Sequence, residues 1–403
     1  MREKEIRKAA QTRKTDRRTE IRASSVQLLL SLIERGSMTT KENLLNNRAL
    51  TSPLIKFLAL DSDEIILSVI ETLKTHVLND KKLTRAVKTG FFASENLLSK
   101  LITLAEHDNI HSEQLTNTAE QFLVDACTIP GNGICFEDRG WYPRADATAT
   151  DEVESKLHNV ILYRFLIQLR PVENIFHRTL ALAILKQSQE LVAPFFARLQ
   201  ISNNVNLTFS LISSLSLWTE IIDLPLPNPF GDTTGLPEDP PPIATAIGSI
   251  MPAIFTKAYL SSGILSGKPL IRLYMLQLVY TVLNKVQLLK TAAQSGNQKW
   301  HDQFDSILET ISRRLPDPQT VLKVYTTSSE HQLNASAAVK VLVLYTDLLS
   351  AISVMPRIDA KLITSALQTQ WNFTSPTGFF NQLYFLRVIH EQGDINWWSK
   401  QGT

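Results

Sequence analysis

Cysteine is scarce in this chain, since Cys127 and Cys135 are the only two among 403 residues. So few cysteines exclude a disulfide framework and favour a reducing compartment. They are also too few for a structural zinc site, unless distant histidines join them. We therefore expect both thiols to be small buried hydrophobic side chains.

Long apolar runs are lacking as well. No stretch approaches the roughly 20 consecutive apolar residues of a transmembrane helix, and the charged N-terminus has no apolar segment of the kind that a secretory signal needs. The 41 Lys and Arg residues nearly balance the 39 Asp and Glu residues, which leaves a formal net charge of +2. This composition favours a nuclear or cytosolic protein with no membrane partner.

Motifs for enzymatic chemistry are missing too. The turn Gly131-Asn132-Gly133 lacks the Lys-Ser/Thr pair and the strand–turn–helix setting of a phosphate-binding loop. His107 and His111 have the i, i+4 spacing of metal ligands, but no third ligand is spaced to match, so a solvated turn between helices is the favoured interpretation. No serine stands in a nucleophile-elbow context. The sequence therefore predicts no catalytic residue, no metal, no cofactor and no small-molecule substrate.

Helical periodicity is what the chain has in abundance. The spacing i, i+3, i+4, i+7, which places apolar residues on one helix face, recurs along the whole chain. Its first instance comprises Val26, Leu29, Leu30 and Ile33. Clean alternation of apolar and polar residues, which marks strands, is hard to find. The pattern predicts an all-α protein of about sixteen helices, each of roughly 10–24 residues.

The predicted helices come in pairs with short connectors, and no strict sequence repeat is visible. Degenerate helical pairs of ~40 residues are typical of armadillo and HEAT repeats, in which each pair buries its apolar stripe only by stacking on its neighbours. We therefore predict an armadillo/HEAT-like α-solenoid. A single helical bundle is the alternative, but one compact core would have to absorb about sixteen helices.

Local start signals support several of the predicted helices. The Asp-Ser-Asp segment at 61–63 precedes an apolar run and offers a side-chain acceptor to the unpaired N–H groups of a helix. Ser37, Thr39 and Thr40 are all placed to cap the next short helix in the same way. The segment 150–154 resembles a capping box.

Two long stretches interrupt the helical pattern, at 129–150 and 223–242. Both combine Pro, Gly and polar residues at a density that excludes a helix. Loops of this length are uncommon in compact proteins and are often functional. We interpret them as excursions from one continuous helical-repeat domain, which spans 26–403 and follows a basic helical segment at 1–25.

Positive charge is concentrated at the N-terminus. Residues 1–22 hold nine Lys or Arg against four acids, a charge of +5, so the rest of the chain carries −3 of the net +2. Basic residues on several faces of a helix suit contacts with nucleic-acid phosphates. A solvated helical extension or a localisation signal is an equally good interpretation. The candidate phosphate contacts are Arg7, Lys8, Arg13, Lys14, Arg17, Arg18 and Arg22.

An aromatic and basic cluster lies in the first long loop. Arg139, Trp141 and Arg144 are residue types that stack on the bases and contact the phosphates of single-stranded RNA, and Tyr142 lies among them. The alternative, which we favour, is a loop pinned to the helices by its aromatic rings.

A set of short motifs follows in a characteristic order from about residue 50 to residue 400. They are Lys88-Thr89-Gly90-Phe91-Phe92, Leu169-Arg170-Pro171, the run from Glu190 to Phe196, Trp218 with the run from Ile221 to Pro227, Pro240-Pro241-Pro242, Met251-Pro252-Ala253, Arg314-Leu315-Pro316-Asp317 and Trp397-Trp398-Ser399-Lys400. In this order and spacing they resemble the N-terminal domain of the nucleolar pre-ribosomal-associated protein 1 family, also called the unhealthy ribosome biogenesis protein 1 family. The chain looks like a fungal member of that family. The resemblance does not clearly include residues 1–25.

The resemblance implies a nucleolar factor of early large-subunit (pre-60S) precursors. Such proteins are similar to large helical-repeat scaffolds that bind pre-ribosomal RNA and small nucleolar RNA (snoRNA), and that associate with a DEAD-box helicase and other early assembly factors. They are far longer than 403 residues, so the resemblance also implies an N-terminal portion. The family has no catalytic motif to transfer.

Two functions are left to compare. The first is a non-catalytic scaffold of the nucleus and nucleolus, which binds pre-ribosomal RNA or snoRNA and assembly factors through a helical-repeat surface during rRNA processing. The second is a protein-only adaptor of the transport or signalling type. The charge of −3 outside the N-terminal segment slightly favours the second.

Overall fold

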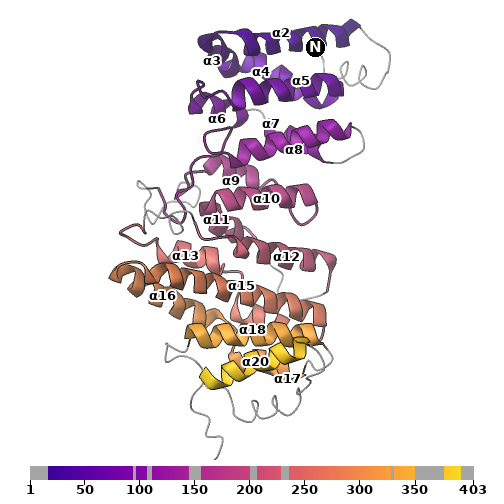
Figure 1. The fold of residues 1–403 in the computed structure, drawn as a ribbon. Helices are drawn as coiled ribbons and strands as arrows, with labels where there is room; N and C mark the ends of the chain where they lie inside the picture. Colours follow the sequence, from indigo (N-terminus) through magenta and orange to yellow (C-terminus); the bar gives the residue numbers. More distant parts are fainter. Residues whose placement is uncertain are drawn as a thin grey trace, which may run out of the picture. The chain divides into compact units, whose positions relative to one another are not determined.

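The regular secondary structure of the described residues is entirely helical (Figure 1). This computed structural model describes residues 17–93, 97–106, 111–144, 156–199, 207–227, 236–327, 331–349 and 376–391. Within these ranges it contains eighteen α-helices and no strand, which confirms the all-α prediction. The sequence pattern predicted about sixteen helices, because helices of only two turns give too few apolar positions to show a full i, i+3, i+4, i+7 repeat.

The chain divides into two compact units, and the first comprises Met1–Asp138 and Arg144–Ser188. Its described helices are α2 (Arg17–Arg35), α3 (Met38–Asn46), α4 (Arg48–Lys56), η1 (Leu58–Leu60), α5 (Asp63–Leu73), η2 (Lys74–Leu78), α6 (Arg85–Ala93), α7 (Leu97–Ala105), α8 (Glu113–Thr128), α9 (Val160–Leu166) and α10 (Ile175–Gln187). Each packs on near neighbours in the chain: α2 lies against α3 and α5, and α8 lies against α5, α7 and α10. Helix α2 runs without a break through residue 25, where a boundary was predicted.

The second unit comprises Arg139–Pro143 and Gln189–Thr403. Its described helices are η4 (Gln189–Leu191), α11 (Val192–Ala197), α12 (Phe209–Asp223), α13 (Ile243–Ile250), α14 (Lys257–Ile264), α15 (Pro269–Gln294), α16 (Gln298–Arg314), α17 (Pro318–Thr327), α18 (Gln332–Leu349) and α20 (Pro376–Glu391). Helix α15 is the centre of this unit, because it is apolar on more than one face and packs on α12, α14, α16 and α18. The prediction of one continuous domain over 26–403 stays a prediction.

Side-chain caps fix several helix starts. Of the three predicted cap candidates, Ser37 is the N-cap of α3, and its Oγ accepts a hydrogen bond from the Thr40 N–H at 3.3 Å. The segment 61–63 was predicted to cap the helix that follows it with a side-chain acceptor. Ser62 is the N-cap of α5, but its side chain makes no cap bond, so that part of the prediction was wrong. Asp63 instead accepts from the Ser112 N–H at 2.8 Å, at the start of α8. The predicted capping box at 150–154 lies outside the described residues.

The first predicted loop begins where α8 ends, and its described part, 129–144, is not helical. Its glycine turn packs against the last turn of α8, where the Ile134 N–H donates to the Ala126 carbonyl at 3.1 Å. Gly133 has a φ of +46°, and a Cβ there would lie 2.5 Å from the Ala126 oxygen. Only glycine fits this close approach, so packing of the turn against α8 explains this residue.

The second predicted loop begins after α12, which ends at Asp223, and it ends before α13. Its described parts, 224–227 and 236–242, are not helical, and residues 228–235 lie outside the described residues. Lys285 of α15 is buried and donates to the Leu224 carbonyl and, at 3.4 Å, to the Pro225 carbonyl. Burial lowers the pKa of Lys285 to about 8.

Candidate functional site

The predicted basic segment is described only in part. Its candidates Arg7, Lys8, Arg13 and Lys14 lie outside the described residues. Arg17 and Arg18 begin helix α2, and their side chains are likewise outside the description. Whether these six residues contact RNA therefore stays a prediction.

Arg22, the seventh candidate, has a structural partner inside the first unit. Its Nε and Nη2 atoms each lie 2.6 Å from a different oxygen of Asp61, a side-on bidentate pair. Nη1 and Nη2 also donate to the carbonyls of Pro53 and Leu54, at 3.2 and 3.4 Å. The side chains of Arg22 and Asp61 are only 12% and 6% exposed. The guanidinium thus joins α2 to the end of α4, and little of it is accessible to a phosphate.

The aromatic and basic loop is held by its rings. Trp141 has no exposed surface, so its indole does not face solvent for stacking on a base. The Tyr142 hydroxyl donates to the Asp239 carbonyl at 2.9 Å within the second unit, and burial raises its pKa to about 12. Arg139 and Arg144 are both exposed. The arrangement is the pinned loop that we favoured, with its two arginines outward.

A second basic group was missed by sequence reasoning. Lys81, Lys82 and Arg85, here called the basic edge, are exposed on the connector before α6 and on its first turn. The Arg85 guanidinium carbon lies 3.6 Å from the centre of the Phe136 ring, a close cation–π stack. None of the three forms an ion pair with an acid among the described residues. The run Lys-Lys-x-x-Arg was visible in the sequence, but its aromatic partner follows only in the first long loop.

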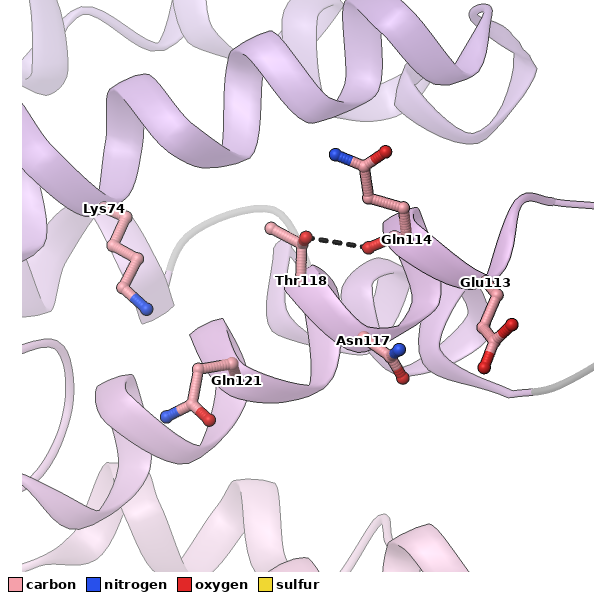
Figure 2. A pocket seen from close by; sticks show the side chains of 6 residues that line it. All are labelled: Lys74, Glu113, Gln114, Asn117, Thr118 and Gln121. Atoms are coloured by element: carbon pink, nitrogen blue, oxygen red, sulfur yellow. Dashed lines mark hydrogen bonds between the residues drawn. The ribbon is translucent and has the colours of Figure 1, made fainter.

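A shallow, open cleft lies between η2 and helix α8, and its volume is about 520 Å³ (Figure 2). We call it the polar cleft, since no apolar or aromatic residue lines it. Its lining residues are Lys74, Glu113, Gln114, Asn117, Thr118 and Gln121. Lys74 belongs to η2, a π-helical turn that continues α5, and such turns are frequent at functional sites.

One carboxylate organises the far end of the polar cleft. Asp125 of α8 accepts from Lys74 Nζ at 2.8 Å with one oxygen, and from Gln121 Nε2 at 2.7 Å with the other. Thr118 Oγ1 donates to the Gln114 carbonyl within the helix, at 2.7 Å. Lys74 is therefore neutralised locally, and the cleft carries no excess of positive charge.

The histidine and cysteine candidates that the structure describes belong to the packing of the first unit. His111 Nδ1 is 2.9 Å from Asp63 Oδ1, and this bond is the largest cause that lowers the pKa of Asp63. Cys127 and Cys135 are both buried, as predicted, and burial raises the pKa of the Cys127 thiol, which disfavours the reactive thiolate. His107, the other half of the predicted histidine pair, lies outside the described residues.

The described residues offer neither a metal-ion cluster nor a membrane-spanning helix. No group of three or more His, Cys, Asp or Glu side chains there is arranged to hold a metal ion. Among the described helices, none combines the length and apolar character that crossing a bilayer requires.

Comparisons with known proteins identify relatives. A sequence model described as "Ribosome 60S biogenesis N-terminal" matches residues 1–214, so the match begins further upstream than the motifs noted above. The chain is also 24% identical over 312 residues to the nucleolar pre-ribosomal-associated protein 1 of Saccharomyces cerevisiae. That alignment covers 74% of this chain and 17% of the yeast protein, so the chain spans only about a sixth of the length of that relative.

Proposed function

The chain belongs to the ribosome 60S biogenesis N-terminal family, and on that premise we propose that it is a non-catalytic scaffold of early pre-60S assembly in the nucleolus. The family match over residues 1–214 is the observation that carries the proposal. The expected partners are pre-ribosomal RNA, snoRNA, a DEAD-box helicase and other early assembly factors. The scaffold role requires a surface with several separate contacts and no reacting groups.

The proposed architecture is an armadillo/HEAT-like solenoid over 26–403, preceded by the basic segment 1–25. Packing inside each unit supports it, because the helices contact near neighbours in the chain. In a repeat array each helical repeat packs on the next repeat, and the exposed rows of side chains become the binding surface.

RNA contact is assigned to the basic edge, to Arg139 and Arg144, and to the basic residues before Arg22. Arg85 supports this assignment, because its stack on Phe136 holds an exposed guanidinium in one orientation. A held guanidinium loses less side-chain entropy when it binds a phosphate. Trp141 and Arg22 take no part in this contact, since one is buried and the other is bound to Asp61.

A salt titration with a matched control tests the RNA contact. Binding of single-stranded pre-ribosomal RNA is measured from low to physiological salt for a triple alanine variant of Lys81, Lys82 and Arg85. If each residue neutralises one phosphate, the slope of log K against log salt falls by about 2, at about 0.7 per contact. The control removes three exposed basic residues that are already paired with acids: Lys257, Lys299 and Arg313. An equal effect of both variants would show that only total charge matters.

A protein-only adaptor is the second candidate, and the polar cleft favours it. Crosslinking in cells separates the two functions. Crosslinks to large-subunit precursor RNA, with early assembly factors dominant in a pull-down, support the scaffold. If no RNA is crosslinked and purified protein does not bind RNA at low salt, RNA contact is excluded and the adaptor remains.

A further inference from the structure

The polar cleft has the chemistry of a site for a protein main chain. We propose that it binds an extended peptide segment of a partner protein, through hydrogen bonds from carboxamide side chains to the peptide backbone. The proposal does not depend on RNA binding by the basic edge, which lies on other residues of the same unit.

The spacing of the carboxamides supports this ligand. Asn117 and Gln121 are four residues apart on α8, so they are separated by about 6 Å along the helix axis. An extended chain repeats every two residues, at about 6.6 Å. A carboxamide carries both N–H donors and a carbonyl acceptor, as a peptide group does. Successive carboxamides can therefore meet successive peptide groups on the same side of the ligand.

Asp125 holds two of the cleft's side chains ready for this contact. It accepts a hydrogen bond from Gln121 Nε2, which leaves the Gln121 carbonyl oxygen as an acceptor for a ligand N–H. It also pairs with Lys74, whose ammonium has further N–H donors for ligand carbonyls. Lys74 comes from η2 and reaches toward α8 (Figure 2), so a bound chain would contact side chains of both elements.

The charge and composition of the cleft disfavour RNA. Base recognition needs aromatic or guanidinium planes for stacking, and none lines the cleft. Phosphates need unpaired positive charge, but Lys74 is bound to Asp125, and Glu113 adds a negative charge at the start of α8. Glu113 favours a ligand with a Lys or Arg at that end. The cleft thus complements a neutral to basic peptide.

The test uses the purified chain and a phage-displayed library of short unstructured peptides. The most enriched peptide is synthesised with a fluorophore, and its affinity is measured by anisotropy. Asn117→Ala and Gln121→Ala are each expected to weaken binding about five- to tenfold, the effect of losing one hydrogen bond. Both side chains are exposed, so the thermal midpoint should stay unchanged.

A matched control exists on α16. Gln298 Nε2 donates to Asp302 at 2.7 Å, the same i, i+4 bond as in the cleft, and Gln298→Ala should leave peptide affinity unchanged. Peptides N-methylated at alternate residues, which lose several N–H groups facing α8, should bind more weakly by at least about five- to tenfold. Methylation of the intervening residues should have little effect.

Three results would overturn the proposal. They are a selected peptide whose binding is insensitive to both Asn117→Ala and Gln121→Ala, a library from which nothing is enriched, and oligouridine RNA that competes for the cleft and loses affinity in Asn117→Ala. None of them bears on the basic edge, because its salt titration uses different residues and a different ligand.

Discussion

The bond between Arg22 and Asp61 offers the sharpest test of how the first unit is held together. Replacement of Arg22 by alanine removes both ion-pair hydrogen bonds at 2.6 Å and leaves a carboxylate that is only 6% exposed. Removal of one partner from a buried ion pair typically costs about 3–5 kcal/mol. Because the Arg22 side chain is 12% exposed, water can reach the site, and we expect the lower end, about 3 kcal/mol.

Hydrogen exchange on α2 measures this loss directly. Helix α2 packs mainly on α3, α5 and η2, so it can open locally while the helices beyond these stay folded. A loss of about 3 kcal/mol accelerates exchange of its protected amides roughly 150-fold, if local opening governs exchange. Arg35→Ala, an exposed change on the same helix, is the control and should alter stability by less than about 0.5 kcal/mol. Arg22→Lys should recover only part of the loss, because an ammonium cannot form the bidentate pair.

The pH dependence gives an independent check. Burial raises the pKa of Asp61, while the Arg22 guanidinium opposes that rise. Without Arg22 the folded state binds a proton at Asp61 more readily than the unfolded state does. The stability of Arg22→Ala therefore recovers as the pH falls through the raised pKa. An acceleration of less than about threefold, or a defect that grows toward acid pH, would refute this account of the bond.

Three further predictions follow from other buried or paired groups. The bonds to His111 and Ser112 lower the pKa of Asp63 below 3.8. Their contribution to the free energy of unfolding is therefore present above about pH 4 and is lost as the pH falls further. Asp63→Asn should remove this part of the acid sensitivity of unfolding. Lys285 has a folded pKa of about 8 against 10.5, so the stability of the native protein relative to Lys285→Met should rise between these pH values, where the unfolded state binds the proton. Trp141→Ala should destabilise the protein by about 3–5 kcal/mol in chemical unfolding, because the side chain is fully buried, and a change below about 1 kcal/mol would contradict the packing role.

Much of the fold was predictable because helical periodicity is a local property. The apolar positions that predicted the first helix include Val26, Leu30 and Ile33, which are buried in α2. Short helices such as α11 and α14 were harder to separate, since two turns display only one or two apolar positions per face. Cap signals located helix starts better than they located partners, as Asp63 shows by bonding to the start of α8.

The candidate sites were less predictable, because they depend on contacts between distant parts of the chain. Charge alone cannot distinguish Arg22 from its basic neighbours, although Asp61 decides its role. Arg85 gains its orientation from Phe136, and the polar cleft combines Lys74 with the exposed face of α8. The burial of Trp141 likewise follows from the packing of the folded chain and not from its own neighbours in sequence.

The two proposed contacts of the first unit differ in the physics that governs them, and this bears on how a scaffold works. Contact through the basic edge is electrostatic and weakens steeply with salt, whereas contact through the carboxamides of the polar cleft depends on hydrogen-bond geometry and is far less sensitive to salt. Two contacts to one particle raise the effective concentration of the second once the first has formed. Loss of either contact removes this gain. Loss of either surface should therefore weaken association with a precursor particle by more than it weakens binding to the isolated RNA or peptide that the other surface contacts.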